Sequence, residues 1–228
     1  MKSKRAQEVA SRLDKLTPTL GKSSLVAVTK YSPVEDIQYA YEWGQKDFGE
    51  NRVQDLEKKA QAFQEKNLEP RWHFIGKLQS NKINQLFKIP NLFAIHSVDS
   101  LKLLEKLYQK ESQFEGDSLL FFLQIKTSDE DEKSGFESKE EIYEALSFIE
   151  KRNVSKLKFF GLMTMGKMRT SEFEKDATKC FEKLKNLRDD INNNFAFSLK
   201  LSMGMSQDYK IAVSLQSDFV RIGSMIFK

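Results

Sequence analysis

Short apolar runs and charged segments alternate along the whole chain. The runs span four to eight residues and are rich in β-branched and aromatic side chains, as in "SLVAVT" and "SLLFFLQI". Runs of this length and composition are typical of buried strands. They predict strands over 24–29, 46–49, 72–76, 92–96, 118–125, 157–163, 197–202 and 219–222.

The segments between these runs have the period of amphipathic helices. Ser138 followed by Glu141 predicts a capping box at the start of one of them. Apolar residues at helical spacing between Ala6 and Leu16 predict a leading helix over 3–20. The remaining helices are expected over 34–43, 51–66, 99–112, 138–152, 171–192 and 206–215.

Strands that alternate with helices predict βα units and a parallel sheet. Eight such units close a (β/α)8 TIM-type barrel, with the leading helix as an extra N-terminal element. An open doubly wound sheet is the alternative, but no G-x-G-x-x-G follows the first strand and no G-x-x-x-x-G-K-[ST] is present. We therefore expect an α/β fold with a single barrel domain over residues 1–228.

Composition and charge narrow the function classes. The 228 residues carry 37 basic and 33 acidic side chains, and a well-mixed net charge of +4 does not indicate nucleic-acid binding. No apolar run approaches the roughly 20 residues of a membrane span, and the charged N-terminus does not resemble a secretory signal. Cys180 is the single cysteine, which excludes an internal disulfide and fits a reducing compartment. We expect a cytoplasmic protein.

Lys30, at the end of the first strand, is a candidate for a chemical role. In a parallel barrel the active face lies at the carboxyl ends of the strands. If Lys30 points into the barrel with Val26 and Val28, desolvation lowers the pKa of its amine, as a Schiff-base lysine requires. Tyr31 then faces the other way. The alternative is an amine that snorkels out to solvent at the strand's end.

The last two strands are each followed by glycine and serine, in "SMGMSQD" and "RIGSM". Free N–H groups at helix N-termini bind anions together with serine hydroxyls, and the loops after strands seven and eight are the usual phosphate position in such barrels. Ordinary helix capping explains the same residues. The combination with Lys30 is more specific, because the first and eighth strands are neighbours in a closed barrel.

The histidines and methionines have structural alternatives. His73 lies within a predicted strand, where a hydrogen-bonded structural role is the more common one, and His96 ends a strand as a cap or a site residue. Neither has the spacing or the nearby carboxylates of a metal site, so we expect no metal. Methionines such as Met163 are core residues by default.

Motifs along nearly the whole chain resemble those of the pyridoxal phosphate homeostasis proteins. They are "LVAVTKYSP", "DFGENRVQD", "WHFIGKLQSNK", "IHSVDS", "EKSGF", "GLMTM", "LSMGMSQDYKIAV" and "FVRIGSMIF", in that order. This family is similar to the N-terminal barrel domain of alanine racemase. The resemblance implies a (β/α)8 barrel that holds pyridoxal 5′-phosphate (PLP) and takes part in its intracellular homeostasis, by sequestering and delivering the cofactor.

The resemblance also implies site residues. Lys30 matches the lysine that forms the internal aldimine, and Arg221 matches the arginine that faces the pyridine nitrogen. Ser202 matches a phosphate contact, and Lys133 matches a lysine in a mobile loop. The other matched positions hold phosphate (Gly223 and Ser224) or line the pocket (Asn51, His73 and Met163).

One position departs from the family pattern. Many members have a second lysine two residues beyond the aldimine lysine, where this chain has Ser32. Transfer of PLP to a lysine at that position is therefore not expected here. Transient binding of PLP by Lys82 or Lys133 is left open.

A carrier is expected rather than an enzyme. Racemisation needs an acid or base on each face of the substrate α-carbon, and in the racemase a second domain of the partner subunit supplies one. Here the last predicted strand ends six residues before the C-terminus, which leaves no such domain. We expect a monomeric PLP-binding protein with at most weak side activity and with PLP-dependent apo-enzymes as candidate recipients. The alternatives are a PLP-dependent amino-acid racemase or other PLP enzyme, and a barrel enzyme that uses Lys30 on a sugar phosphate.

Overall fold

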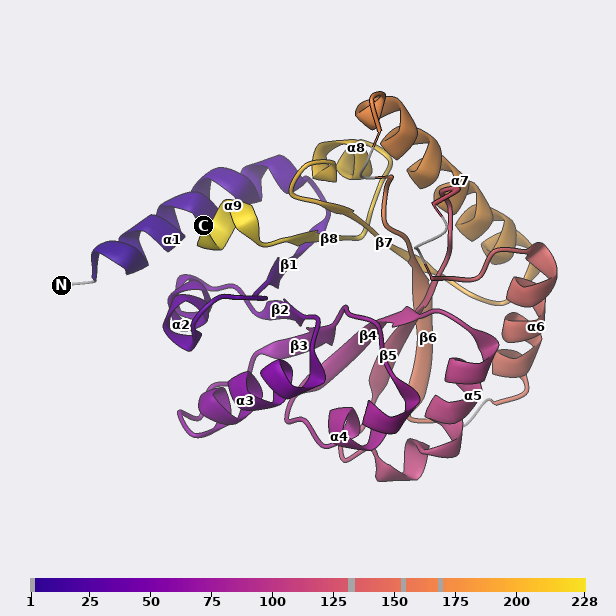
Figure 1. The fold of residues 1–228 in the computed structure, drawn as a ribbon, viewed down its shortest axis with the longest axis horizontal. Helices are drawn as coiled ribbons and strands as arrows, with labels where there is room; N and C mark the ends of the chain where they lie inside the picture. The colour runs from indigo at the N-terminus through magenta and orange to yellow at the C-terminus, as the bar shows by residue number, and fades with distance from the viewer. Residues whose placement is uncertain (1–2, 131–133, 153–154, 168–169) are drawn as a thin grey trace.

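The computed structural model describes residues 3–130, 134–152, 155–167 and 170–228. In this part of the chain, eight parallel strands close into a barrel in chain order, with β1 paired to β8. Figure 1 shows the strands at the centre and the helices around them, so the expected α/β barrel is confirmed. The strands are β1 (Ser24–Val28), β2 (Asp47–Glu50), β3 (Arg71–Phe74), β4 (Leu92–Val98), β5 (Leu119–Gln124), β6 (Leu157–Met163), β7 (Lys200–Met205) and β8 (Phe219–Ile222).

Helices follow the strands as the alternating pattern predicts. The capping box at Ser138 is present, because its hydroxyl accepts from the Glu141 N–H while the Glu141 carboxylate accepts from the Ser138 N–H. The helices are α1 (Lys4–Leu16), α2 (Val34–Trp43), α3 (Val53–Gln64), α4 (Ile83–Phe87), α5 (Leu101–Gln109), α6 (Lys139–Glu150), α7 (Phe173–Asn194), α8 (Tyr209–Ser214) and α9 (Ser224–Phe227). Short 3-10 turns cover Thr17–Leu20, Ser80–Lys82 and Glu111–Gln113.

The extra N-terminal helix α1 lies beside the C-terminal helix α9, as the indigo and yellow ribbons show (Figure 1). Arg5 Nη2 donates to the Phe227 carbonyl oxygen at 2.6 Å, and Arg12 Nη1 donates to the Ile226 carbonyl oxygen at 3.1 Å. Carbonyls in the last turn of a helix have no partner within the helix. The two arginines therefore supply those partners and fasten α1 onto α9.

Apolar side chains pack in two separate layers. The larger cluster fills the space between the sheet and the helices, and it includes Leu25 and Ala27 of β1. A smaller cluster of Ala94, Phe122 and Met163 fills the barrel, flanked by partly buried aromatic residues. Because side chains alternate along a strand, both layers come from the same strands.

The seventh strand begins three residues later than the sequence indicated, over Lys200–Met205 instead of 197–202. Phe197 reads as a strand residue, but it packs edge-to-face on Phe159, with ring centroids 5.2 Å apart. The strand continues through "SMGM" because Gly204 takes a φ of 95° where the register with β8 shifts. Ser202 therefore lies inside the strand and not at its end.

Cys180 is buried on α7, where its thiol lies 3.7 Å from the Thr127 carbonyl oxygen. Within the residues that the structure describes, no helix is long and apolar enough to cross a membrane. Over the same residues, no group of three or more His, Cys, Asp and Glu side chains is placed to hold a metal ion.

Candidate functional site

Lys30 lies two residues beyond the end of β1, at the carboxyl end of the barrel. The residue is exposed, whereas Val26 and Val28 are buried. A turn brings Lys30 out, since the Ser32 N–H donates to the Thr29 carbonyl oxygen at 2.8 Å and Tyr31 takes a φ of 67°. The prediction of a desolvated Lys30 amine is therefore wrong, and the alternative of an amine that reaches solvent describes the structure.

A buried ion pair lies behind the turn that carries Lys30. Lys59 on α3 reaches Glu50 at the end of β2, with Nζ 2.5 Å from Oε1. The same Nζ donates to the Thr29 carbonyl oxygen at 2.8 Å, and Glu50 Oε2 accepts from the Asn51 N–H at 2.8 Å. The pair therefore fixes the backbone immediately before Lys30 and at Asn51.

Hydroxyl groups from two strand ends meet on the neighbouring side of the barrel rim. Ser206 follows β7, Ser224 follows β8, and their Oγ atoms are hydrogen-bonded at 2.9 Å. Gly223 approaches β1 so closely that a Cβ atom there would lie 2.5 Å from the Val28 carbonyl oxygen. Only glycine fits this approach, and it brings the serine pair next to the strand that ends in Lys30.

Arg221 lies below this rim, inside the barrel. The residue is 5% exposed and is paired in register with Val26 of β1. Its Nη1 donates to Ser202 Oγ at 2.6 Å, and its Nη2 donates to the Thr164 carbonyl oxygen at 2.9 Å. Both acceptors are neutral, so neither hydrogen bond cancels the charge of the guanidinium.

A chain of hydrogen bonds continues from Arg221 across the interior of the barrel. Ser202 Oγ lies 2.8 Å from His96 Nδ1, and His96 Nε2 lies 2.9 Å from His73 Nδ1. His73 Nε2 lies 2.9 Å from Asp47 Oδ1. Arg221, Ser202, His96, His73 and Asp47 together are called the buried chain below. It joins β8 and β7 to β4, β3 and β2.

Burial sets the electrostatics of the buried chain. It lowers the pKa of Arg221 to about 10, which leaves the guanidinium protonated at neutral pH, and Asp208 opposes the shift. Burial also lowers the pKa of His73, against the pull of Asp47, and lowers the pKa of His96 well below its ordinary value. Desolvation alone would raise the pKa of Asp47, but hydrogen bonds from His73 and Arg71 outweigh it and the pKa is lowered.

The remaining predicted site residues differ in how deeply they are buried in the barrel. Asn51 is half-buried at the end of β2 and Met163 is buried inside the barrel. His73 has both ring nitrogens engaged, which agrees with the alternative of a hydrogen-bonded structural histidine. Lys82 ends the 3-10 turn after β3, with Nζ 3.3 Å from Gln85 Oε1. Lys133 lies outside the described residues.

Ser206 lies in "SMGMSQD", which the sequence offered as an anion site or as ordinary helix capping, but the resemblance did not assign it a role. Lys59 was not among the predicted site residues. Lys59 occupies the apolar stripe of α3 with Leu56 and Phe63, so a charged residue on a buried helix face was the available signal.

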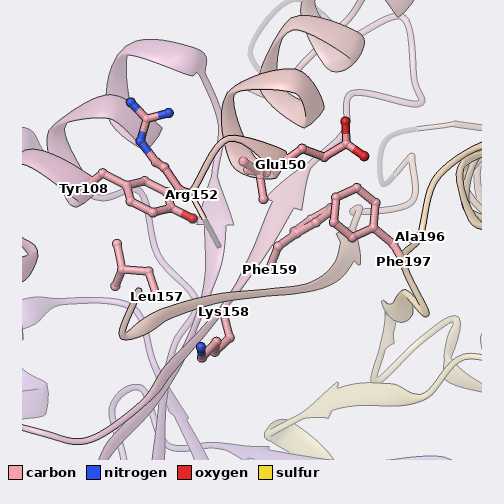
Figure 2. Close-up of a pocket in the computed structure, with 9 residues that line it drawn as sticks. Tyr108, Glu150, Arg152, Leu157, Lys158, Phe159, Ala196 and Phe197 are labelled. Carbon is pink, nitrogen blue, oxygen red and sulfur yellow. The ribbon is translucent and has the colours of Figure 1, made fainter. Parts of the chain in front are cut away.

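A hollow lies by the amino end of β6 (Figure 2), whereas Lys30 follows the carboxyl end of β1. Tyr108, Arg152, Phe159 and Phe197 line it among others. Arg152 stacks on aromatic rings, with its guanidinium carbon 3.4 Å from the Phe148 ring centroid and 5.4 Å from that of Tyr108. The Arg152 side chain therefore packs over the faces of aromatic rings, which accounts for its position in the hollow.

The arrangement at the carboxyl end suits one kind of ligand. An exposed amine at Lys30 can attack an electrophilic carbon, and the hydroxyls of Ser206 and Ser224 can bind an anion next to it. Arg221 supplies a cation whose hydrogen-bond acceptors are neutral. The close approach at Gly223 leaves backbone instead of side chain against this site. A small anion that carries an electrophilic carbon fits these residues.

Comparison with known proteins identifies the family. The family model for the alanine racemase N-terminal domain matches residues 5–228. A pyridoxal phosphate homeostasis protein of Helicobacter pylori is 40% identical over 206 residues, 90% of this chain and 86% of that protein. The human pyridoxal phosphate homeostasis protein is 37% identical over 235 residues, 99% of this chain and 82% of the human one.

Solved structures agree with the sequence comparison. PipY of Synechococcus elongatus without PLP has a TM-score of 0.87 and 29% identity, covering 96% of this chain and all of that one. The structure of PipY with PLP bound has a TM-score of 0.85 over the same shares of both chains. The resemblance that the motifs indicated is confirmed. This chain belongs to the alanine racemase N-terminal domain family and, within it, to the pyridoxal phosphate homeostasis proteins.

Proposed function

We propose that this protein binds PLP at the carboxyl ends of β1, β7 and β8 and takes part in homeostasis of the cofactor. The observation that carries the proposal is the juxtaposition of the Lys30 strand with Gly223 and the paired hydroxyls of Ser206 and Ser224. The PLP-bound structure of PipY and the names of the relatives support it.

Each residue has a role in this proposal. When bound, PLP supplies an aldehyde that condenses reversibly with an amine and a pyridine ring that accepts electron density. Lys30 is the amine, and Gly223, Ser224 and Ser206 hold the phosphate. Arg221 faces the pyridine nitrogen. Ser202, which the resemblance matched to a phosphate contact, is instead proposed to support Arg221 from below, because its hydroxyl contacts Arg221 and His96. Asn51 and Met163 line the pocket, and His73 contributes only through the buried chain.

We infer that the protein holds and delivers PLP, with at most weak catalytic activity. The homeostasis names of the relatives support this role. A cytoplasmic monomer that passes PLP to apo-enzymes is the form we propose. Sedimentation of the purified protein tests the monomer. Retention of the α-hydrogen of alanine in deuterated water, with PLP-loaded protein, separates the carrier from a racemase.

The experiment for PLP binding uses Lys30→Ala. Borohydride reduction of the wild-type protein after addition of PLP fixes one phosphopyridoxyl group on the peptide that contains Lys30, as mass spectrometry will show. The alanine variant loses that label, because no amine remains at the end of β1. Lys82→Ala is the matched control, since it removes another lysine near the same rim and keeps the label on Lys30. An unlabelled wild-type protein, or equal labelling of Lys30→Ala at a different lysine, contradicts the assignment.

A further inference from the structure

We propose that His96 and His73 are positioning residues that act through Ser202 to hold the Arg221 guanidinium in place for PLP. The inference rests on the proposed function. It is carried by the continuous hydrogen bonds of the buried chain, from Arg221 on β8 to Asp47 on β2.

Chemistry at the two ends fixes the direction of every hydrogen bond. An arginine can only donate, so Ser202 Oγ accepts from Arg221. An ionised carboxylate can only accept, so His73 Nε2–H donates to Asp47 Oδ1. Burial disfavours the charged form of both rings, so each carries one proton. In a neutral His73 ring Nδ1 is then an acceptor, and His96 Nε2–H is its donor. His96 Nδ1 is in turn the acceptor for the Ser202 hydroxyl, so each neutral ring carries its proton on Nε2.

The surroundings keep both rings in this form. His73 and His96 are 0% exposed. Phe122 stacks on His96 with ring centroids 4.3 Å apart, and Phe219 lies 6.1 Å and 6.2 Å from His96 and His73. A proton added to His96 would place a second buried cation next to Arg221, with no carboxylate in contact with it. Apolar packing and the like charge of Arg221 both disfavour that state.

The direction of the chain matters for Arg221. A hydroxyl that donates one hydrogen bond becomes a stronger acceptor for another. His96 therefore strengthens the hydrogen bond that Ser202 accepts from Arg221. Together with the Thr164 carbonyl oxygen, Ser202 fixes the plane of the guanidinium from inside the barrel. Other N–H groups of the guanidinium are left for a ligand above. Removal of His96 leaves the arginine in place and loosens its orientation.

The first test observes the chain directly, without PLP. The sequence contains two histidines, so protein labelled with 15N-histidine gives nitrogen signals from His73 and His96 alone. We expect both rings to show a protonated Nε2 and an unprotonated Nδ1 at neutral pH. Ser202→Ala shifts the Nδ1 signal of His96. Ser217→Ala, which removes a buried hydroxyl from the same barrel wall, leaves it unchanged. A protonated Nδ1 on either ring overturns the proposal.

The second test is a double-mutant cycle on PLP affinity, measured by equilibrium titration. We expect His96→Leu and Ser202→Ala each to weaken binding about tenfold, and the double variant to be no weaker than Ser202→Ala alone. His96→Gln keeps a side-chain acceptor and donor, so it restores part of the affinity. Should His96→Leu fail to fold, His96→Gln alone completes the cycle with a smaller loss.

The outcomes separate the two levels of inference. Additive losses in the double variant overturn the positioning role while wild-type PLP binding stands. Failure of the wild-type protein to bind PLP overturns the proposed function, and the positioning role with it.

Discussion

Lys59 and Arg221 are both buried cations near the carboxyl end of the barrel, and the protein surrounds them differently. Lys59 is 9% exposed and contacts the Glu50 carboxylate at 2.5 Å. Arg221 is 5% exposed and contacts a hydroxyl and a carbonyl oxygen, while the anionic end of its chain, Asp47, lies on β2. The charge of Lys59 is neutralised by a direct ion pair, whereas Arg221 is oriented by neutral hydrogen-bond acceptors and its charge is supported by the buried Asp208 carboxylate.

The difference separates a structural cation from a binding cation. A buried ion pair holds two elements together, here α3 and the ends of β1 and β2, and has no charge left to attract a ligand. A buried cation with neutral acceptors is less stable in isolation, and its pKa is lowered accordingly. It interacts favourably with an electron-rich ligand that enters the site. The comparison therefore assigns Lys59 to the fold and Arg221 to the ligand.

The largest expected effect is on stability, from Lys59→Met. The variant leaves the Glu50 carboxylate buried at 1% exposure without its cation, which costs about 3–5 kcal/mol. Urea unfolding followed by circular dichroism measures the loss. The double variant Lys59→Met/Glu50→Gln removes both charges and should recover most of it. A double variant as unstable as the single one would show that lost packing, not the orphaned charge, is responsible.

Arg221→Met should cost less stability than Lys59→Met and more PLP affinity. The variant breaks no direct hydrogen bond to a carboxylate, although Asp208 loses a favourable charge interaction, and the main loss is an unsatisfied Thr164 carbonyl oxygen, worth about 1–3 kcal/mol. PLP retention, measured by equilibrium dialysis, should fall strongly because no cation remains at that position. The same urea experiment compares the two variants. A larger stability loss for Arg221→Met than for Lys59→Met would reverse the comparison.

The buried chain makes stability fall on mild acidification. Burial lowers the pKa of both histidines. Below about pH 6.5 the unfolded chain therefore binds protons that the folded chain does not bind. The free energy of unfolding is therefore highest above this pH and decreases below it. A ring that stays neutral loses about 1 kcal/mol between pH 6.5 and 5.5, and we expect a total of about 1–2 kcal/mol. His96→Gln should remove about half of the decrease, and an unchanged slope would show that other groups cause it.

The sequence was sufficient for the barrel because each βα unit has its own local pattern. The sequence was not sufficient to predict how far inside the barrel each site residue lies, because that position depends on where a strand ends. "SMGM" reads as a loop, yet Gly204 lets β7 continue to Met205. This places Ser202 inside the barrel and Ser206 at the rim.

Contacts across the barrel were also beyond the sequence. Nothing in the local patterns of His73 and His96 indicates that His73 Nδ1 lies 2.9 Å from His96 Nε2. The register of two strands brings the rings together. Lys30 illustrates the opposite case. Its position at the end of β1 followed from the alternation, but its exposure follows from the turn at Thr29–Ser32.

The smallest expected effect concerns that turn and links it to Lys59. Tyr31 has a φ of 67° and is 80% exposed, so its side chain gains little from packing while its backbone is strained. Tyr31→Gly removes about 1–2 kcal/mol of left-handed strain and adds about 0.5–1 kcal/mol of chain entropy, for a net gain of about 0.5–1 kcal/mol. Thermal unfolding of both proteins measures it.

If the bond from Lys59 to the Thr29 carbonyl oxygen holds the turn in this shape, the gain should shrink in a Lys59→Met background, where Tyr31 can relax on its own. Equal gains in both backgrounds would mean that the turn keeps its shape without the ion pair. In that case Lys59 serves α3 and Glu50 alone, and the position of Lys30 is set by β1 itself.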